Sequence, residues 1–217
     1  YPGECYPSDV LWAVAALQRA AALEGTHVNN LAAALMQALD GPLRAAEGLP
    51  AFQVDAPTGY RLQGARGCGN SGILLFAPDL DKRMAAAWYA AYVSNFWSST
   101  GGLTGFTEMP RNQPASVVDV DSGPVILGLG SVASAFGIGA ARRAGDLDRA
   151  AALTWQAVAC SWPTPAGFLI PGLMGQLAIR AGPLGELALL FAMTRPLPSG
   201  EIPAATRHAP GIVRGLL

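Results

Sequence analysis

The alternation of short and long breaks between helical segments constrains this chain most. Apolar residues recur at helical spacing in eight segments, which are residues 9–24, 30–46, 68–77, 81–97, 122–143, 147–161, 173–181 and 184–194. The short breaks are residues 25–29, 78–80 and 144–146, and the long ones are residues 50–67, 98–118 and 162–172. A short break between two helices places them side by side and antiparallel. The sequence therefore predicts helical hairpins joined by long loops.

Two local signals add detail to this pattern. Gly41 and Pro42 should end or kink the second predicted helix, because neither residue suits a helix interior. Within the first long loop, residues 52–54 and 60–62 are predicted to pair as a short β-hairpin.

Two of the predicted hairpins share a sequence pattern. The stretch DLDKRMAAAW from Asp79 to Trp88 matches DLDRAAALTW from Asp146 to Trp155. Each stretch places an acidic helix cap before basic residues and a Trp. Because such a repeat favours stacked hairpins, we expect an all-α fold, an (α/α) toroid or a partial toroid, as a single domain over residues 1–217. The long loops would then surround the mouth of a central cavity on one face.

Composition and spacing argue against several classes of function. Charged residues make up 13% of the chain and the net charge is −1, so nucleic-acid binding is disfavoured. Apolar runs are too short or too interrupted to predict a membrane-spanning helix. The three cysteines and two histidines lack the spacing of metal ligands. The Gly-rich run GLGSVASAFGIG lacks a preceding strand, which favours close helix packing over a dinucleotide site. We therefore expect neither a metal nor a cofactor.

Several stretches carry a resemblance to a known family, namely YPSDVLWAVAAL, GARGCGNSGILLFAPDLDKRMAAAWYAAYV, GFTEMPRN and DVDSGPVILGLGSVASAFGIGAARRAGD. Over residues 6–195 the chain resembles the bacterial (α/α) toroid proteins of the linalool dehydratase/isomerase-like group, many of them membrane-linked. The resemblance implies a metal-free lyase or isomerase that acts on a small hydroxylated substrate, isoprenoids included. It also implies association with a membrane protein, and a toroid that is partial or lacks its first hairpins.

The chain departs from this family at the residues that carry its chemistry. Terpene-acting members are expected to use Cys, His, Tyr and Asp around the cavity. This chain has only His27 and His208, and both lie outside the predicted mouth loops. The catalytic residues of the family therefore cannot be transferred position by position.

The segment DVDSGP contains two candidate catalytic residues, Asp119 and Asp121. At the start of the predicted helix 122–143, either carboxylate can exchange a proton with a substrate beside the helix N-terminus. The alternative is structural. Asp121 or Ser122 would cap the helix, with Pro124 in its first turn, and Asp119 would tie down the loop.

Glu108, in the stretch GFTEMPRN, is the third candidate catalytic residue, with Phe106 and Arg111 beside it as candidate substrate-binding residues. Paired carboxylates across a cavity suit acid/base elimination or isomerisation. They also suit glycoside hydrolysis, so a carbohydrate-active enzyme is an alternative function. A structural alternative is a surface Glu108 paired with Arg111.

The other candidate substrate-binding residues come from the remaining loops and helix starts, and they are Tyr6, Asp9, Tyr60, Arg66, Asn70 and Trp162. Arg66 can clamp a polar or anionic group of a substrate, or pair with Asp119 as a structural bridge. Cys68 starts a predicted helix, where a thiol gains acidity. Since no His is placed to act as its base, we interpret Cys68 as a buried, inert residue.

A third function remains open beside the two enzymes: a non-catalytic scaffold or accessory domain whose carboxylates only hold the loops. The expected partners are a small-molecule substrate, a membrane protein and a second copy of the chain. Both a cytoplasmic and a membrane-associated or periplasmic location are compatible with the sequence.

Overall fold

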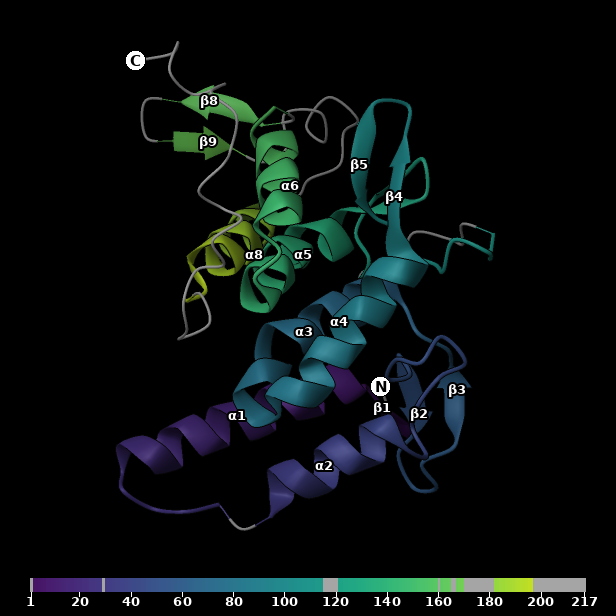
Figure 1. Ribbon diagram of the computed structural model, residues 1–217, viewed down its shortest axis with the longest axis vertical. Helices are drawn as coiled ribbons and strands as arrows, with labels where there is room; N and C mark the ends of the chain where they lie inside the picture. Colours follow the sequence, from purple (N-terminus) through teal and green to yellow (C-terminus); the bar gives the residue numbers. More distant parts are fainter. Residues whose placement is uncertain are drawn as a thin grey trace.

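The computed structural model describes residues 2–28, 30–114, 121–159, 161–164, 167–169 and 182–196. These residues form a mostly helical structure with small antiparallel sheets (Figure 1). The helices are α1 Pro7–Leu23, α2 Leu31–Asp40, α3 Gly67–Leu80, α4 Lys82–Phe96, α5 Ser131–Ala144, α6 Leu147–Ala159 and α8 Gly182–Thr194. The predicted helix at residues 173–181 lies outside the described residues.

Four small sheets accompany the helices. The first combines β1 Glu4–Cys5, β2 Gln53–Asp55 and β3 Arg61–Gln63 in the order β1-β2-β3. The others are the pairs β4 Trp97–Thr100 with β5 Leu103–Phe106, β6 Val125–Ile126 with β7 Leu129–Gly130, and β8 Trp162–Thr164 with β9 Gly167–Leu169. The pairing predicted between residues 52–54 and 60–62 is confirmed with a shift of one residue. The all-α expectation is corrected, because two further loops also contain hairpins.

The helical hairpins follow the predicted short connections. Asp81 alone separates α3 from α4, and its carboxylate accepts a hydrogen bond from the N–H of Met84 at 2.8 Å. Asp146 caps α6 in the same way, accepting from the N–H of Arg149 at 3.1 Å. The repeated acidic caps are therefore confirmed, but Asp81 corresponds to Asp146. The sequence match aligned Asp79 with Asp146, so it is shifted by two residues from the alignment of the two helix caps in the structure.

Helices α3 and α5 pack side by side and run in the same direction. Near their starts, a Cβ placed on Gly67 would lie 3.0 Å from the Cβ of Ala133. Further along, a Cβ on Gly139 would lie 2.2 Å from Cδ2 of Leu75. The two contacts advance together along both helices, which fixes their parallel orientation. The close approach of the helices favours glycine at position 139, whereas at position 67 the carbonyl oxygen of Thr107, 2.1 Å from an added Cβ, requires it.

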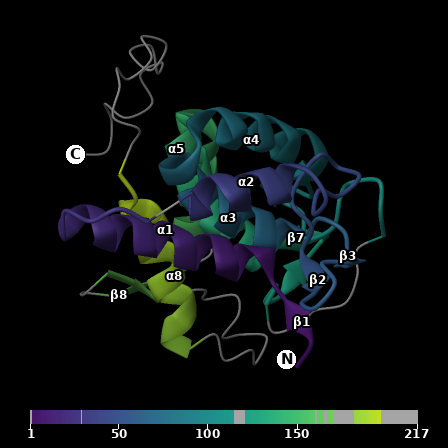
Figure 2. The same ribbon diagram turned by 90° about the horizontal axis from the view of Figure 1, so that it is seen from below.

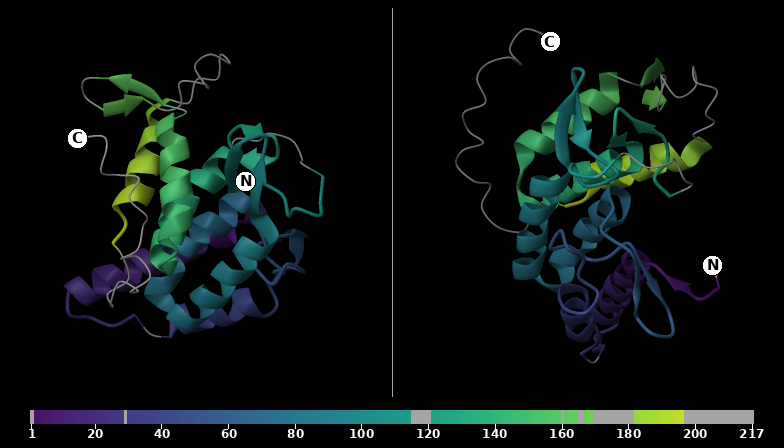
Figure 3. Two further views of the ribbon diagram at one scale, coloured as in Figure 1. Left: turned by 45° about the horizontal axis from the view of Figure 1, so that its top comes forward. Right: turned by 90° about the vertical axis from the view of Figure 1, so that its right-hand side faces the viewer.

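Helix α8 continues the parallel set on the far side of α5, and α1 continues it beside α3. Gly139 also faces Ala192 of α8, and three residues later Arg142 donates to the carbonyl of Arg195. Tyr6, directly before α1, contacts Phe52, which lies against Gly69 at the start of α3. Six residues later, Trp12 contacts Phe76 further along α3. The β1-β2-β3 and β4-β5 sheets lie on the side of the molecule where α3 and α5 begin (Figure 2; Figure 3, right).

Residues 122–130 were predicted as the start of a helix, and this prediction is wrong. They form the β6-β7 hairpin, whose turn residues Leu127 and Gly128 have φ values of 51° and 83°. Two successive positive φ angles characterise the two-residue turn that matches the twist of paired strands. Helix α5 begins only at Ser131. Gly130 is at its N-cap position, where Asp121 or Ser122 had been predicted, although the carbonyl of Ser122 accepts from the N–H of Val132 at 3.4 Å. Pro124 is not in the first turn.

The other element boundaries differ less from expectation. Helix α2 ends at Asp40, directly before the predicted break at Gly41 and Pro42. Helix α3 extends to Leu80 with Pro78 inside its last turns, where a tight connection had been predicted. Within the described ranges, no helix combines the length and the apolar character needed to cross a bilayer.

The close approach of three helices at Gly139 is testable. Replacing Gly139 with Ala should destabilise the fold by about 1–3 kcal/mol through overpacking, although Ala is the better helix former. The added Cβ would press on Leu75 and on the backbone of Ala192. Urea denaturation measures the change. Ala151→Gly, on the exposed side of α6, is the control and should cost only about 1 kcal/mol. A Gly139→Ala protein as stable as the wild type would contradict this packing.

Candidate functional site

Glu108 lies where three segments of the chain meet. It follows β5, and its backbone N–H donates to the carbonyl of Gly128 in the β6-β7 turn at 3.1 Å. Its backbone carbonyl accepts from the N–H of Gly67, the first residue of α3, at 2.8 Å. The backbone of Glu108 therefore connects the strand pair in front of α5 to the start of α3.

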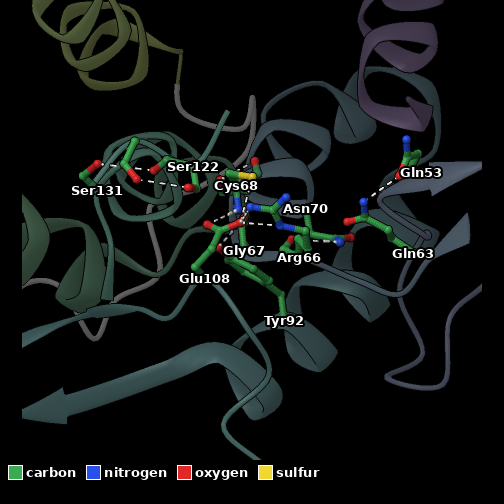
Figure 4. Close-up of polar contacts among 12 residues, drawn as sticks. Gln53, Gln63, Arg66, Gly67, Cys68, Asn70, Tyr92, Glu108, Ser122 and Ser131 are labelled. Atoms are coloured by element: carbon green, nitrogen blue, oxygen red, sulfur yellow. Dashed lines mark hydrogen bonds and ion pairs between the residues drawn. The ribbon is translucent and has the colours of Figure 1, made fainter. Parts of the chain in front are cut away.

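The side chain of Glu108 is held by Arg66 and Cys68 (Figure 4). Arg66 donates from Nε to Oε1 at 2.8 Å, and its terminal nitrogen NH2 also lies 2.8 Å from Oε1. The backbone N–H of Cys68 donates to Oε2 at 3.2 Å, and its Sγ lies 3.0 Å from Oε1. Glu108 is 1% exposed and Arg66 is 6% exposed. This group of three side chains is called the Glu108 cluster below.

The carboxylate also lies between the N-terminal ends of two parallel helices. Cys68 is the second residue of α3, and Gly130 directly precedes α5. A Cβ on Gly130 would come within 2.8 Å of Oε2 of Glu108, so only glycine fits there without displacing the carboxylate. Unpaired N–H groups and the helix dipole make such ends favourable for negative charge.

Burial governs the protonation of this carboxyl. It raises the pKa of Glu108 above the ordinary value of 4.5, although the hydrogen bonds of Cys68 and the charge of Arg66 act in the opposite direction. Glu108 therefore keeps its proton to a higher pH than a surface glutamate does. A carboxyl with a raised pKa can donate a proton at a higher pH than a surface glutamate can.

A further layer of buried residues fixes the cluster in place. The guanidinium of Arg66 lies over the ring of Phe52, 4.3 Å from its centroid. The amide of Asn70 donates to the carbonyl of Arg66 at 3.2 Å and to that of Pro50 at 3.1 Å. The hydroxyl of Tyr92, a fully buried residue, donates to the carbonyl beside Cys68, that of Gly67, at 3.0 Å.

Three of the predicted binding residues lie at or next to this cluster. Arg66 belongs to it, and Asn70 supports it from α3. Tyr6 contacts it indirectly, because its ring meets the edge of Phe52 at a centroid distance of 5.4 Å. The hydroxyl of Tyr6 donates to Glu4 at 3.0 Å.

Other predicted residues lie elsewhere. Phe106 is a core residue rather than a mouth residue, because its ring stacks on Tyr92 at 4.3 Å and is fully buried. Tyr60, Asp9 and Arg111 are exposed on the surface. Arg111 donates to the carbonyl of Ser94. The alternative that pairs a surface Glu108 with Arg111 is therefore wrong, since Glu108 is buried against Arg66.

Three predicted residues remain, namely Asp121, Asp119 and Trp162. Asp121 is exposed at the start of the segment that leads into β6. Asp119 lies outside the described residues, so its predicted pairing with Arg66 or with a substrate stays a prediction. Trp162 lies in β8, and its side chain lies outside the described part of the structure.

Cys68 is the residue whose role sequence reasoning missed. It was interpreted as inert because no His lies near it. In the structure its partner is a carboxyl group that comes from 40 residues further along the chain. The signal that pointed toward it was its position at a helix start, two residues after Arg66 in the stretch ARGCGN.

Two surface depressions lie away from the Glu108 cluster. One, of about 310 Å³, lies between α1, α2 and the start of α4, and includes Gln18 and Met84. The other, of about 290 Å³, lies along β3 and includes Glu47 and Tyr60. Neither contains Arg66, Cys68 or Glu108 in its lining. Within the described ranges, no group of three His, Cys, Asp or Glu residues is arranged to hold a metal ion.

Comparison with known proteins gives no match: no protein family, curated protein or solved structure matches this chain. The resemblance to the linalool dehydratase/isomerase-like group therefore stays a prediction from sequence. Functional inference rests on the geometry of the Glu108 cluster.

The raised pKa of Glu108 predicts a pH dependence of stability. The folded state holds this proton more tightly than the unfolded chain. The stabilisation that comes from this tighter proton binding is complete below pH 4.5. It is lost as the pH rises through the pKa of Glu108 in the folded state. We therefore expect the free energy of unfolding of the wild type, minus that of Glu108→Gln, to fall as the pH rises above 4.5. Urea denaturation between pH 4 and 8 measures this difference in the free energy of unfolding. Glu24→Gln, which removes an exposed carboxyl, is the control. A difference that rises with pH would mean that the charge of Arg66 lowers the pKa of Glu108 by more than burial raises it.

Proposed function

We propose that this chain is an acid/base enzyme, a lyase or isomerase of small hydroxylated substrates, with Glu108 as its proton-transfer group. The observation that carries the proposal is a buried carboxyl of raised pKa, in contact with a thiol and an arginine at the start of α3. Carboxyl groups whose pKa is shifted by burial and by a specific charged partner are candidates for catalytic sites. The sequence resemblance implies the same class of reaction.

The chemistry needs no group beyond these side chains and the substrate. Protonated Glu108 delivers its proton to the substrate hydroxyl, whose C–O bond breaks so that water departs. The resulting carboxylate then takes a proton from the adjacent carbon, and the electrons of that C–H bond form the double bond. Glu108 ends protonated, as it began. Arg66 and the N–H of Cys68 stabilise the intervening carboxylate.

The same proposal includes the architecture. We propose that α1, α3, α5 and α8 are successive inner helices of an (α/α) toroid, with α4 and α6 returning outside them. The parallel orientation of the four helices and the short connections of α3 to α4 and of α5 to α6 support this arrangement. The Glu108 cluster then lies at the end of the ring where the inner helices begin, which is where the predicted mouth loops gather.

A structural role is the second candidate, and one observation favours it. Glu108 is almost fully buried and each of its carboxylate oxygens already has partners. In this function the cluster only ties the strand pairs to the helix starts. The carbohydrate-active alternative requires a second carboxylate across a cavity, and Asp121 is exposed at the surface. Association with a membrane protein and self-association stay predictions from sequence.

The proposal is tested by assaying water loss and oxygen exchange with a panel of small allylic alcohols in ¹⁸O-labelled water. We expect turnover by the wild type, and a reduction of about 100-fold or more in Glu108→Gln, because a general acid/base group contributes that much. Glu24→Gln, which removes an exposed carboxyl at the end of α1, should keep wild-type activity.

Circular dichroism checks that each variant is folded. A folded wild type that turns over none of the panel, or a Glu108→Gln variant with wild-type activity, would overturn the proposal. Either result would leave the structural role as the better account.

A further inference from the structure

A second cluster of charged residues lies at the opposite ends of the same helices. Asp79 is in the last turn of α3, Arg142 and Arg143 are in the last turn of α5, and Arg195 directly follows α8. These four residues are called the arginine cluster. It shares no residue with the Glu108 cluster and is separated from it by the length of α3.

One carboxylate bridges two of the arginines. Asp79 forms an ion pair through Oδ1 with Arg143, and its Oδ2 lies 3.0 Å from the terminal nitrogen NH2 of Arg195. Arg195 also donates to the carbonyl of Leu75 at 3.1 Å, and Arg142 donates to the carbonyl of Arg195 at 3.4 Å. A carbonyl of α3 and the carbonyl of Arg195, directly after α8, thus each accept from a guanidinium. Positive charge near the C-terminal end of a helix is favoured by the helix dipole.

The positive charge of the cluster exceeds its negative charge. The cluster contains three guanidinium groups and one carboxylate, of which Arg143 and Arg195 pair with Asp79. The partial charges of the helix ends offset only part of the difference. The pKa of Arg195 is lowered, first by burial and then by the positive charges of Arg143 and Arg19, against the attraction of Asp79. The site therefore carries uncompensated positive charge where water is largely excluded.

The arginines also have unused hydrogen-bond donors. Each guanidinium has five N–H donors, yet the Nε atoms of Arg142, Arg143 and Arg195 are buried without a hydrogen-bond partner among the described residues. The side chains of Arg143 and Arg195 are only 10% and 8% exposed, whereas that of Asp79 is 42% exposed. Solvent therefore reaches the cluster on the side of Asp79.

The guanidinium of Arg195 is held in place by two aromatic rings. It lies 4.6 Å from the ring centroid of Phe76 and 5.3 Å from that of Phe191. Stacking on two aromatic rings fixes the plane of the donors, which reduces the entropy that a ligand would have to remove.

We propose that the arginine cluster binds a phosphate group beside Asp79. A doubly charged oxyanion supplies the missing negative charge and several acceptors for the arginine forks. The carboxylate of Asp79 already occupies one bridging position, and it repels an incoming anion. Asp79 therefore limits the affinity, and its removal strengthens phosphate binding. The inference is independent of the proposed reaction at Glu108.

The test is a titration of the full chain with inorganic phosphate at constant ionic strength, with chloride as the reference salt, read out by thermal unfolding and calorimetry. We expect saturable binding by the wild type. Arg142→Gln, which leaves both ion pairs of Asp79 in place, should weaken binding about tenfold or more. Asp79→Asn should strengthen it, and Arg111→Gln, at an exposed arginine among the loops, should leave it unchanged.

A second measurement separates the sources of the phosphate group. Cosedimentation with phosphatidylcholine vesicles, with and without phosphatidic acid, tests for a lipid headgroup. Binding to the acidic vesicles that is lost in Arg142→Gln supports a headgroup, whereas phosphate binding without vesicle binding supports a soluble phosphate compound. Non-saturable stabilisation, or equal binding by all variants, would overturn the proposal as a general salt effect.

Discussion

The carboxylate of Glu108, buried between the starts of two parallel helices, is the interaction on which the described structure depends. An isolated carboxylate in this position would be costly, because burial removes its water. Arg66 and the N–H of Cys68 replace that water, and Gly130 leaves the space that the carboxylate fills. Since the backbone of Glu108 is also bonded to Gly67 and to the β6-β7 turn, the strand pairs and the helix starts are positioned together.

The parallel helices then have chemically different ends. At the starts of α3 and α5 a single buried carboxyl accepts from the N–H of Cys68. At the opposite ends the arginines contact Asp79 and the carbonyls of Leu75 and Arg195. Both arrangements follow the direction of the helix dipole. Close packing makes the parallel set possible, because Gly139 brings α5 against both α3 and α8. If neighbouring helices were antiparallel, N-terminal and C-terminal ends would lie side by side, and neither charged cluster would form.

Sequence reasoning predicted the elements that depend on local signals. The acidic caps at Asp81 and Asp146 and the break after α2 are local, and the structure confirms them. The segment 122–130 was predicted wrongly because its apolar and glycine residues suit a buried helix and a tight hairpin equally well. Glu108 was predicted as a candidate catalytic residue, which stays a prediction, and its structural partner was sought at Arg111, nearby in sequence. Arg66 is 42 residues away, and only the tertiary fold brings it to Glu108.

The most direct test of this account is a double-mutant cycle between Arg66 and Glu108, measured by urea denaturation at pH 7 with Arg66→Met, Glu108→Gln and the double variant. Removing Arg66 alone leaves a buried carboxyl without its cation, which should cost about 3–5 kcal/mol. The double variant should lose about 1.5–3 kcal/mol less stability than the sum of the losses in the two single variants. Additivity of the two losses within about 0.5 kcal/mol would contradict the claim that this pair holds the helix starts together.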